Sequence, residues 1–289
     1  MSRVIGIDIG GTNLRIGIVD ESGNVSAFRK VRTKEVLRSY SVLVDLAEFI
    51  ESYADGVKFD AVAAGFPATL NRERTKILQA PNLEYMENLP VVEYLSERLG
   101  VPVFAERDVT MTLFYDVKKY ALPIEGIITG IYFGTGIGNA IMIDGMPLTG
   151  RNGTAGELGH IHVDGHDEPC GCGLRGCMET LAGGKYLAKR YDASEIAEVF
   201  VNHADELGEF VSRMAASVAC EVNILDPDYV IVGGGVVNMQ GFPVEELHRK
   251  IIAYTRKPYP AENLRVIFAE DEAFKSVAGA GYYAMGRMM

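Results

Sequence analysis

Three cysteines and a histidine stand close enough in the sequence to bind one metal ion. The four residues are His160, Cys170, Cys172 and Cys177, one imidazole and three thiols within eighteen residues. Such a set is typical of a closed, tetrahedral structural zinc site. Cysteines this close could instead be incidental or redox-active, but Gly173 and Gly176 allow the bends that a metal knuckle needs. The pattern predicts structural Zn²⁺.

Two glutamates flank this cluster. Glu157 precedes His160 by three residues, and Glu179 follows Cys177 by two. Metal binding would draw both carboxylates toward one place, where they could accept hydrogen bonds from ligand hydroxyl groups. The alternative is a solvated surface position, which is the usual environment of glutamate.

Three glycine-rich segments follow predicted strands. Without a Cβ, the backbone N–H groups of such a segment can approach a phosphate closely. Taken alone, each is equally explained as a hairpin tip or a tight strand-to-helix turn. Their spacing matches neither a Walker loop nor a dinucleotide-binding fingerprint. The segments are Asp8-Ile9-Gly10-Gly11-Thr12, Gly134-Thr135-Gly136-Ile137-Gly138 and Gly233-Gly234-Gly235.

Two aspartates stand near the ends of predicted strands. Asp8 could position Mg²⁺, directly or through water, beside phosphates held by the first glycine segment. Asp108 follows a strand over residues 101–105, where a helix begins. It could cap that helix or act as a general base in a cleft, and its sequence position does not decide between them.

Strands and helices alternate along the chain in an order typical of an α/β fold. The first glycine segment joins strands over 4–9 and 14–19, and the second joins strands over 126–133 and 139–143. This repeated layout suggests a duplicated unit, one in each of two lobes. Further strands are predicted over 25–31, 61–66, 101–105, 229–232 and 264–269, and helices over 42–50, 91–99, 109–120, 211–225, 244–254 and 276–287.

Composition limits the class of protein. With 289 residues, 48% of them hydrophobic and 23% charged, the chain suits two globular lobes. A net charge of −11 argues against a general binder of nucleic acid or anionic membranes. Apolar runs such as 127–133 are far shorter than the roughly 20 residues that span a bilayer, and Asp8 interrupts any signal peptide. We expect a soluble, cytoplasmic protein.

Taken in order, these motifs resemble those of the ROK family (repressor, open reading frame, kinase) over nearly the whole chain. Segments 8–12 and 134–138 resemble its two phosphate motifs, and 233–235 its adenosine motif. Segments 155–160 and 170–179 are similar to its zinc-and-sugar signatures. The resemblance implies a two-lobed α/β fold of the actin-like, sugar-kinase type (ribonuclease H-like) with a structural zinc knot.

The same resemblance implies lobe boundaries and residue roles. A smaller lobe covers 1–114, with a helix at about 275–289 packing back on it, and a larger lobe covers 115–274 with the zinc site. Asp108 is then the base that assists ATP-dependent phosphorylation of a hexose at its 6-hydroxyl, in a homodimer. The residues that would bind the phosphates of ATP are Asp8 with Mg²⁺, Gly10, Gly11, Thr12, Gly134, Thr135 and Gly136, and those that would bind adenosine are Gly233, Gly234 and Gly235. The residues that would bind the sugar are Asn82, Arg107, Asp108, Glu157, His160 and Glu179. The ligands of Zn²⁺ would be His160, Cys170, Cys172 and Cys177.

Two positions depart from the glucokinases of the family. Ala68 ends a sugar-side loop that usually ends in glycine, and Arg107 stands where asparagine usually precedes the catalytic aspartate. Arg107, with segments 65–68, 80–83 and 225–228, resembles the D-allose kinases. An arginine facing the sugar could read an inverted C3 hydroxyl. D-allose is therefore favoured, with glucokinase, fructokinase or N-acetylmannosamine kinase as the alternative.

A function of another class is a non-catalytic, sugar-responsive regulator. Family repressors carry an N-terminal helix-turn-helix domain, and a first phosphate motif that begins at Asp8 leaves no room for one. The acidic balance also gives no electrostatic footprint for DNA. A silent sugar sensor would have no need of both Asp8 and Asp108, so the sequence favours the kinase.

Overall fold

The computed structural model describes residues 2–288, which form two compact α/β units. Unit 1 runs to Leu122 and includes Thr149–Ala155 and the chain from Glu272 on; unit 2 comprises Pro123–Leu148 and Gly156–Asp271. The lobe boundaries expected from the sequence stay a prediction. The one at 114/115 falls inside helix α4 (Asp108–Lys119), which lies wholly in unit 1.

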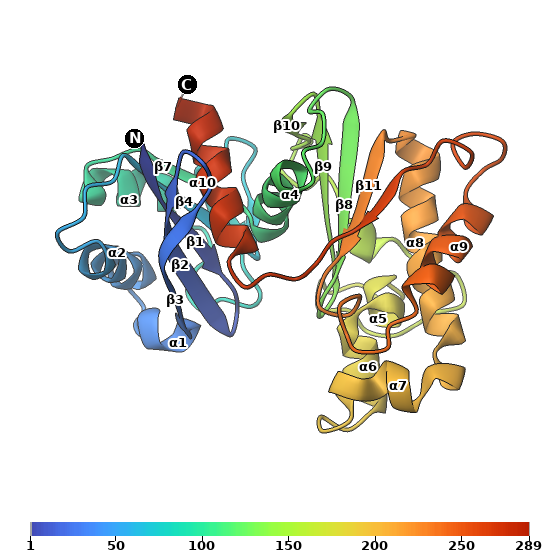
Figure 1. Ribbon diagram of the computed structural model, residues 1–289. Helices are drawn as coiled ribbons and strands as arrows, with labels where there is room; N and C mark the ends of the chain where they lie inside the picture. Colours follow the sequence, from blue (N-terminus) through green and yellow to red (C-terminus); the bar gives the residue numbers. More distant parts are fainter. Residues whose placement is uncertain (1, 289) are drawn as a thin grey trace. The chain divides into compact units, whose positions relative to one another are not determined.

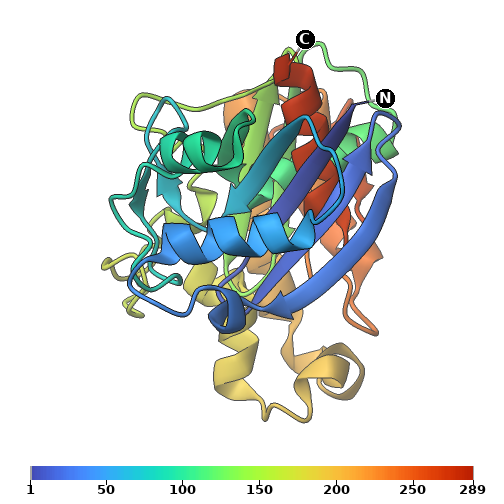
Figure 2. The ribbon, with the colours of Figure 1, turned by 90° about the vertical axis from the view of Figure 1, so that its left-hand side faces the viewer.

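Unit 1 is built on a five-stranded sheet of order β3-β2-β1-β4-β7. β1 pairs antiparallel with β2 and parallel with β4, and β7 continues the parallel part. On one face, alternating apolar residues form a core with α2 (Val42–Tyr53) and α3 (Val91–Leu99); Figure 2 shows α2 lying across the sheet. The strands are β1 (Arg3–Ile9), β2 (Asn13–Asp20), β3 (Val25–Arg32), β4 (Ala61–Phe66) and β7 (Val103–Arg107).

The other face of this sheet carries α4 and the C-terminal helix α10 (Lys275–Met288). A Cβ on Gly6 would lie 2.3 Å from the carbonyl oxygen of Val277, so glycine in β1 lets α10 approach the sheet. Likewise, a Cβ on Gly279 would lie 1.8 Å from the carbonyl oxygen of Met111 in α4. α10 therefore packs on β1, β4 and α4 (Figure 1).

Unit 2 repeats this layout with the strand order β10-β9-β8-β11-β12. β8 pairs antiparallel with β9 and parallel with β11, as β1 pairs with β2 and β4. Helices α8 (Gly208–Leu225) and α9 (Val244–Tyr254) contribute apolar residues to its core. The similar arrangement of the two predicted hairpins is thus confirmed. The strands are β8 (Ile127–Phe133), β9 (Ile137–Ile143), β10 (Met146–Pro147), β11 (Tyr229–Gly233) and β12 (Val266–Phe268).

Short elements were not predicted, because they contain too few residues for a periodic pattern. One of them, the hairpin of β5 (Thr69–Leu70) and β6 (Ile77–Gln79), lies in unit 1. Over residues 2–288, no helix has the length and apolar character needed to cross a membrane. The remaining short elements are α1 (Thr33–Val36), η1 (Leu158–His160), α5 (Glu179–Ala182), α6 (Gly184–Arg190), η2 (Ile196–Glu198), α7 (Val199–Asn202) and η3 (Ala204–Glu206).

Candidate functional site

A row of charged side chains crosses the sheet of unit 1 beside the first glycine tip. Strand pairing aligns Lys30, Arg15, Asp8, Gly65 and Glu106 across β3, β2, β1, β4 and β7. Directly paired residues face the same side of a sheet. Arg15 therefore lies beside Asp8, and its Nη1 donates a 2.6 Å hydrogen bond to Asp8 Oδ2.

Asp108 is the first residue of α4 and lies over this row. A Cβ on Gly65 would come within 3.1 Å of Asp108 Cα, so the glycine makes room for the start of the helix. Arg107 takes the N-cap position, and the Val109 N–H donates to Asp108 Oδ1 at 2.7 Å. Arg107, and not Asp108, thus occupies the N-cap position of α4.

The two aspartates are electrostatically linked. Desolvation raises the pKa of Asp108 from 3.8 to about 7, and the nearby Asp8 carboxylate adds to the rise. Burial also raises the pKa of Asp8, against the lowering effect of Arg15. A carboxyl group that titrates near neutral pH suits a general base.

The first glycine tip is fixed by its own backbone and by Asn82. The Gly10 N–H donates to Asn13 O at 2.9 Å, and the Thr33 N–H donates to Thr12 O at 3.0 Å. A Cβ on Gly11 would lie 3.1 Å from the Asn82 carbonyl oxygen. Unit 1 therefore brings Asn82 to the tip that follows Asp8.

Arg107 is only 7% exposed. Its backbone N–H donates to Glu106 Oε1 at 2.8 Å, and its Nη1 donates to Ala155 O at 3.0 Å. The guanidinium therefore lies against the short segment Thr149–Ala155 of unit 1 and not in bulk solvent. Whether it contacts a sugar stays a prediction.

In unit 2 the four predicted metal ligands come together. Cys170 Sγ lies 3.6 Å from His160 Nδ1, Cys172 Sγ lies 3.6 Å from Cys177 Sγ, and all four ligand atoms lie within 4.8 Å of one another. Zinc bonds of about 2.3 Å to sulfur separate tetrahedral ligand atoms by about 3.8 Å. The donor set and its dimensions therefore fit zinc.

Both predicted glutamates lie beside this cluster. Glu157 Oε2 is 3.7 Å from His160 Nε2, whereas the other nitrogen of the ring, Nδ1, faces Cys170. Glu179, the first residue of α5, accepts a hydrogen bond of 3.1 Å from the Cys170 thiol. Glu157 is exposed and Glu179 half-buried, so both carboxylates have access to a ligand.

The second glycine tip lies against Glu179 and the start of α6. The Gly184 N–H donates to Gly134 O at 2.7 Å, and the Lys185 N–H donates to Thr135 O at 2.9 Å. A Cβ on Gly136 would lie 2.1 Å from Glu179 Oε2. The backbone of the second glycine tip and the Glu179 carboxylate thus lie side by side in unit 2.

The triple-glycine turn is packed on the end of β8, next to the same tip. Gly234 has φ +94°, and a Cβ there would lie 2.6 Å from Phe133 O, so this position requires glycine. The Val236 N–H donates to Phe133 O at 2.9 Å. The two predicted nucleotide motifs of unit 2 are therefore neighbours.

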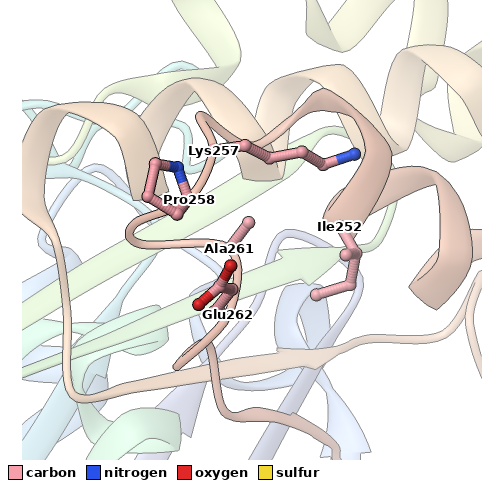
Figure 3. Close-up of a pocket in the computed structure, with 5 residues that line it drawn as sticks. All are labelled: Ile252, Lys257, Pro258, Ala261 and Glu262. Carbon is pink, nitrogen blue, oxygen red and sulfur yellow. The ribbon is translucent and has the colours of Figure 1, made fainter.

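A separate pocket of unit 2, with a volume of about 490 Å³, lies at the end of α9 (Figure 3). Because no predicted site residue lines it, it lies outside the candidate site. Its lining residues are Ile252, Lys257, Pro258, Ala261 and Glu262.

The sequence reasoning missed three residues near Asp108 and Asp8. Arg15 had a usable signal, because the register of a hairpin with a short tip places it opposite Asp8. Arg74 and Glu106, which pair at 3.0 Å, are 32 residues apart and carry no local signal.

The two units have sheets of equivalent strand order, and each sheet contains a glycine-tipped hairpin. This arrangement defines a two-lobed, kinase-like α/β fold. The sequence model of the ROK family matches residues 4–287, and the chain belongs to this family.

Individual relatives agree with this assignment. A glucokinase of Thermotoga maritima is 29% identical over 280 residues, 87% of this chain and 88% of that protein. An N-acetyl-D-glucosamine kinase of Mannheimia succiniciproducens is 30% identical over 262 residues, 81% and 84% of the two chains. The crystal structure of a ROK family glucokinase from Streptomyces griseus, in complex with glucose and AMPPNP, superposes with a TM-score of 0.81, 25% identity and coverage of 96% and 98%.

Proposed function

We propose that the protein transfers the terminal phosphoryl group of ATP to the 6-hydroxyl of a hexose. The sugar-kinase class is supported by relatives named for that activity that match more than four fifths of the chain. The use of ATP is supported by the AMPPNP complex of the Streptomyces griseus glucokinase. The observation that carries the proposal is Asp108, a carboxyl group with a pKa of about 7 beside the Asp8 carboxylate.

Asp108 would accept the proton of the attacking hydroxyl as the bond to phosphorus forms. Asp8 would hold Mg²⁺, which when bound neutralises charge on the phosphate oxygens. Backbone N–H groups of the tips would orient the phosphates, and the triple-glycine turn would receive the adenosine. The phosphate-binding residues are Gly10, Gly11, Thr12, Gly134, Thr135 and Gly136, and the adenosine-binding residues are Gly233, Gly234 and Gly235.

On the sugar side, Glu157, His160 and Glu179 would accept or donate hydrogen bonds to hydroxyl groups, together with Asn82, Arg107 and Asp108. Zn²⁺ held by His160, Cys170, Cys172 and Cys177 would fix the segments that carry these groups. The distances of 3.1 Å from Cys170 to Glu179 and 3.7 Å from His160 to Glu157 support this link between metal site and carboxylates.

D-allose is the hexose that we propose as favoured. The support is Arg107, which precedes the base and is buried, as an arginine that reads a hydroxyl should be. A glucokinase, fructokinase or N-acetylmannosamine kinase is the alternative, and the names of the relatives above favour glucose or N-acetylglucosamine for those proteins. A homodimer is a further proposal, which sedimentation equilibrium tests.

A sugar panel with coupled detection of ADP tests the proposal. Purified protein with ATP and Mg²⁺ is assayed with D-allose, D-glucose, D-fructose, N-acetylmannosamine and N-acetylglucosamine. We expect the highest kcat/KM with D-allose. Faster turnover of another sugar would overturn the substrate, and no sugar-dependent ADP with any of them would overturn the kinase.

A further inference from the structure

Arg74 is a buried arginine with two specific acceptors. It lies in the turn between β5 and β6 with φ +58° and is 8% exposed. Its Nε donates to Glu106 Oε2 at 3.0 Å, and its Nη1 donates to Gly153 O at 2.8 Å. Glu106 itself is fully buried, so the two charges compensate each other away from water.

Glu106 links this ion pair to the residue before the proposed base. Its second oxygen, Oε1, accepts the Arg107 N–H at 2.8 Å. One carboxylate therefore connects the Arg74 guanidinium with the backbone that leads into Asp108. Movement of Arg74 would be transmitted to Asp108 through this single side chain.

The second acceptor of Arg74 lies in the segment Thr149–Ala155. This segment belongs to unit 1, although the chain on both sides of it belongs to unit 2. Arg74 holds it at Gly153 O, and Arg107 holds it at Ala155 O. Gly153 has φ +79°, and a Cβ there would lie 2.3 Å from Leu70 O, so the segment fits closely. Glu157 follows Ala155 by two residues.

We propose that Arg74 is a positioning residue of the kinase site. Through Glu106 it fixes the backbone before Asp108, and through Gly153 it fixes the segment that leads to Glu157. The roles of Asp108 and Glu157 rest on the function proposed above, whereas the restraint on the segment does not. The two can therefore be tested separately.

Limited trypsin digestion tests the restraint without any catalytic readout. Arg151 is an exposed trypsin site within the segment, and Arg190 is an exposed site in unit 2 that serves as internal reference. In Arg74→Met we expect cleavage after Arg151 to accelerate at least about tenfold relative to cleavage after Arg190, because charged hydrogen bonds are lost. Arg72→Met, which removes an exposed arginine of the same turn, should leave the ratio unchanged.

An unchanged ratio in Arg74→Met, or equal acceleration at both sites, would overturn the proposal. Glu106→Gln keeps an acceptor for the Arg107 N–H but removes the charge that faces Arg74, and an intermediate ratio is expected. This variant carries the test if Arg74→Met does not fold. Arg74→Lys, which keeps the charge, should restore part of the protection.

Kinetics then test the link to the site. In Arg74→Met we expect the KM for the hexose to rise several-fold more than the KM for ATP, because the segment leads to a proposed sugar ligand. Equal changes of both constants would overturn the positioning role. If no variant and no wild-type protein phosphorylates a sugar, the proposed function fails while the digestion result still stands.

Discussion

The two glycine-tipped hairpins, β1–β2 in unit 1 and β8–β9 in unit 2, have the same place in sheets of the same order but different side chains. In the first hairpin, Ile9 and Leu14 form the pair nearest the tip, and Asp8 and Arg15 form the next pair. The corresponding pair in the second hairpin is Tyr132 and Gly138. The same scaffold thus places an ion pair at this position in unit 1 and an aromatic residue opposite a glycine in unit 2.

Each hairpin has a glycine on the neighbouring parallel strand at this position, Gly65 beside Asp8 and Gly233 beside Tyr132. Gly65 makes room for the backbone of Asp108. Gly233 makes room for the Tyr132 ring and Ala269, which a Cβ there would approach to 3.2 and 3.1 Å. The space above the glycine is therefore filled by the start of a helix in unit 1 and by side chains in unit 2.

The strongest test of this contrast removes the charge of unit 1. Asp108→Asn should lower kcat by about 10²- to 10⁴-fold with little change in the KM for ATP, because a positioned base is lost. Asp55→Asn, at an exposed position of the same unit, should behave as wild type. More than a tenth of the wild-type kcat in Asp108→Asn would contradict the assignment of the base.

The pH profile should reflect the same group. A base must be deprotonated, and the pKa of Asp108 is raised to about 7, so kcat/KM should fall about tenfold per pH unit below pH 7 and level off above it. Initial rates with saturating ATP between pH 5 and 8.5 measure this. A flat profile over that range would mean that another group takes the proton.

Alanine in each tip compares the two hairpins directly. Gly136→Ala places a Cβ where Glu179 Oε2 now lies, at 2.1 Å, so it must displace that carboxylate. We expect kcat/KM for the hexose to fall about 10- to 100-fold. Gly11→Ala meets Asn82 O at 3.1 Å and should cost only a few-fold. Equal losses in the two variants would show that the tips do not differ in this way.

Zinc binding should depend on the cysteine cluster of unit 2. Cys170→Ser should lower bound zinc from about one equivalent to near zero and reduce Tm by about 5–10 °C, because metal binding contributes to folding. Cys220→Ser, on α8, is the matched control and should retain the metal. Elemental analysis and calorimetry provide the measurements, and equal zinc in both variants would rule out Cys170 as a ligand.

The smallest effect concerns a buried carboxyl group of unit 2. Glu221 accepts a 2.8 Å hydrogen bond from Asn139, and burial raises its pKa from 4.5 to about 7. Wild-type stability should therefore fall as pH rises from about 4.5 to 7, whereas Glu221→Gln has no such loss. At pH 8 the variant should be about 1–3 kcal/mol more stable, and at pH 4 the two should be similar.

Urea unfolding at the two pH values measures this difference. Glu209→Gln, on the exposed side of the same helix, should show no gain at pH 8, because the pKa of Glu209 is lowered by its bond to Arg213. A stability difference that does not change with pH would contradict the titration of Glu221.

The sequence predicts the elements that repeat a pattern and misses those that depend on distant partners. The strand over 61–66 and the helices over 91–99 and 244–254 agree with the structure residue by residue, because a continuous apolar run marks the strand and apolar residues at helical spacing mark the helices. The cluster of His160 with three cysteines, the predicted zinc site, was also identifiable, because its residues are near in sequence. Arg74 and Glu106 were not, because their pairing exists only once β5, β6 and β7 have come together.

The first tip also limits how the length of this chain can change. Side chains alternate along a strand, so an insertion between Gly10 and Asn13 that shifts β2 by one residue against β1 would turn Arg15 toward the face where Leu14 and Ile16 form the core. Asp8 would lose its cation, and a guanidinium would enter a dry interior. Substitutions leave this alternation intact. Among related sequences, we therefore expect substitutions at this tip but no insertions or deletions.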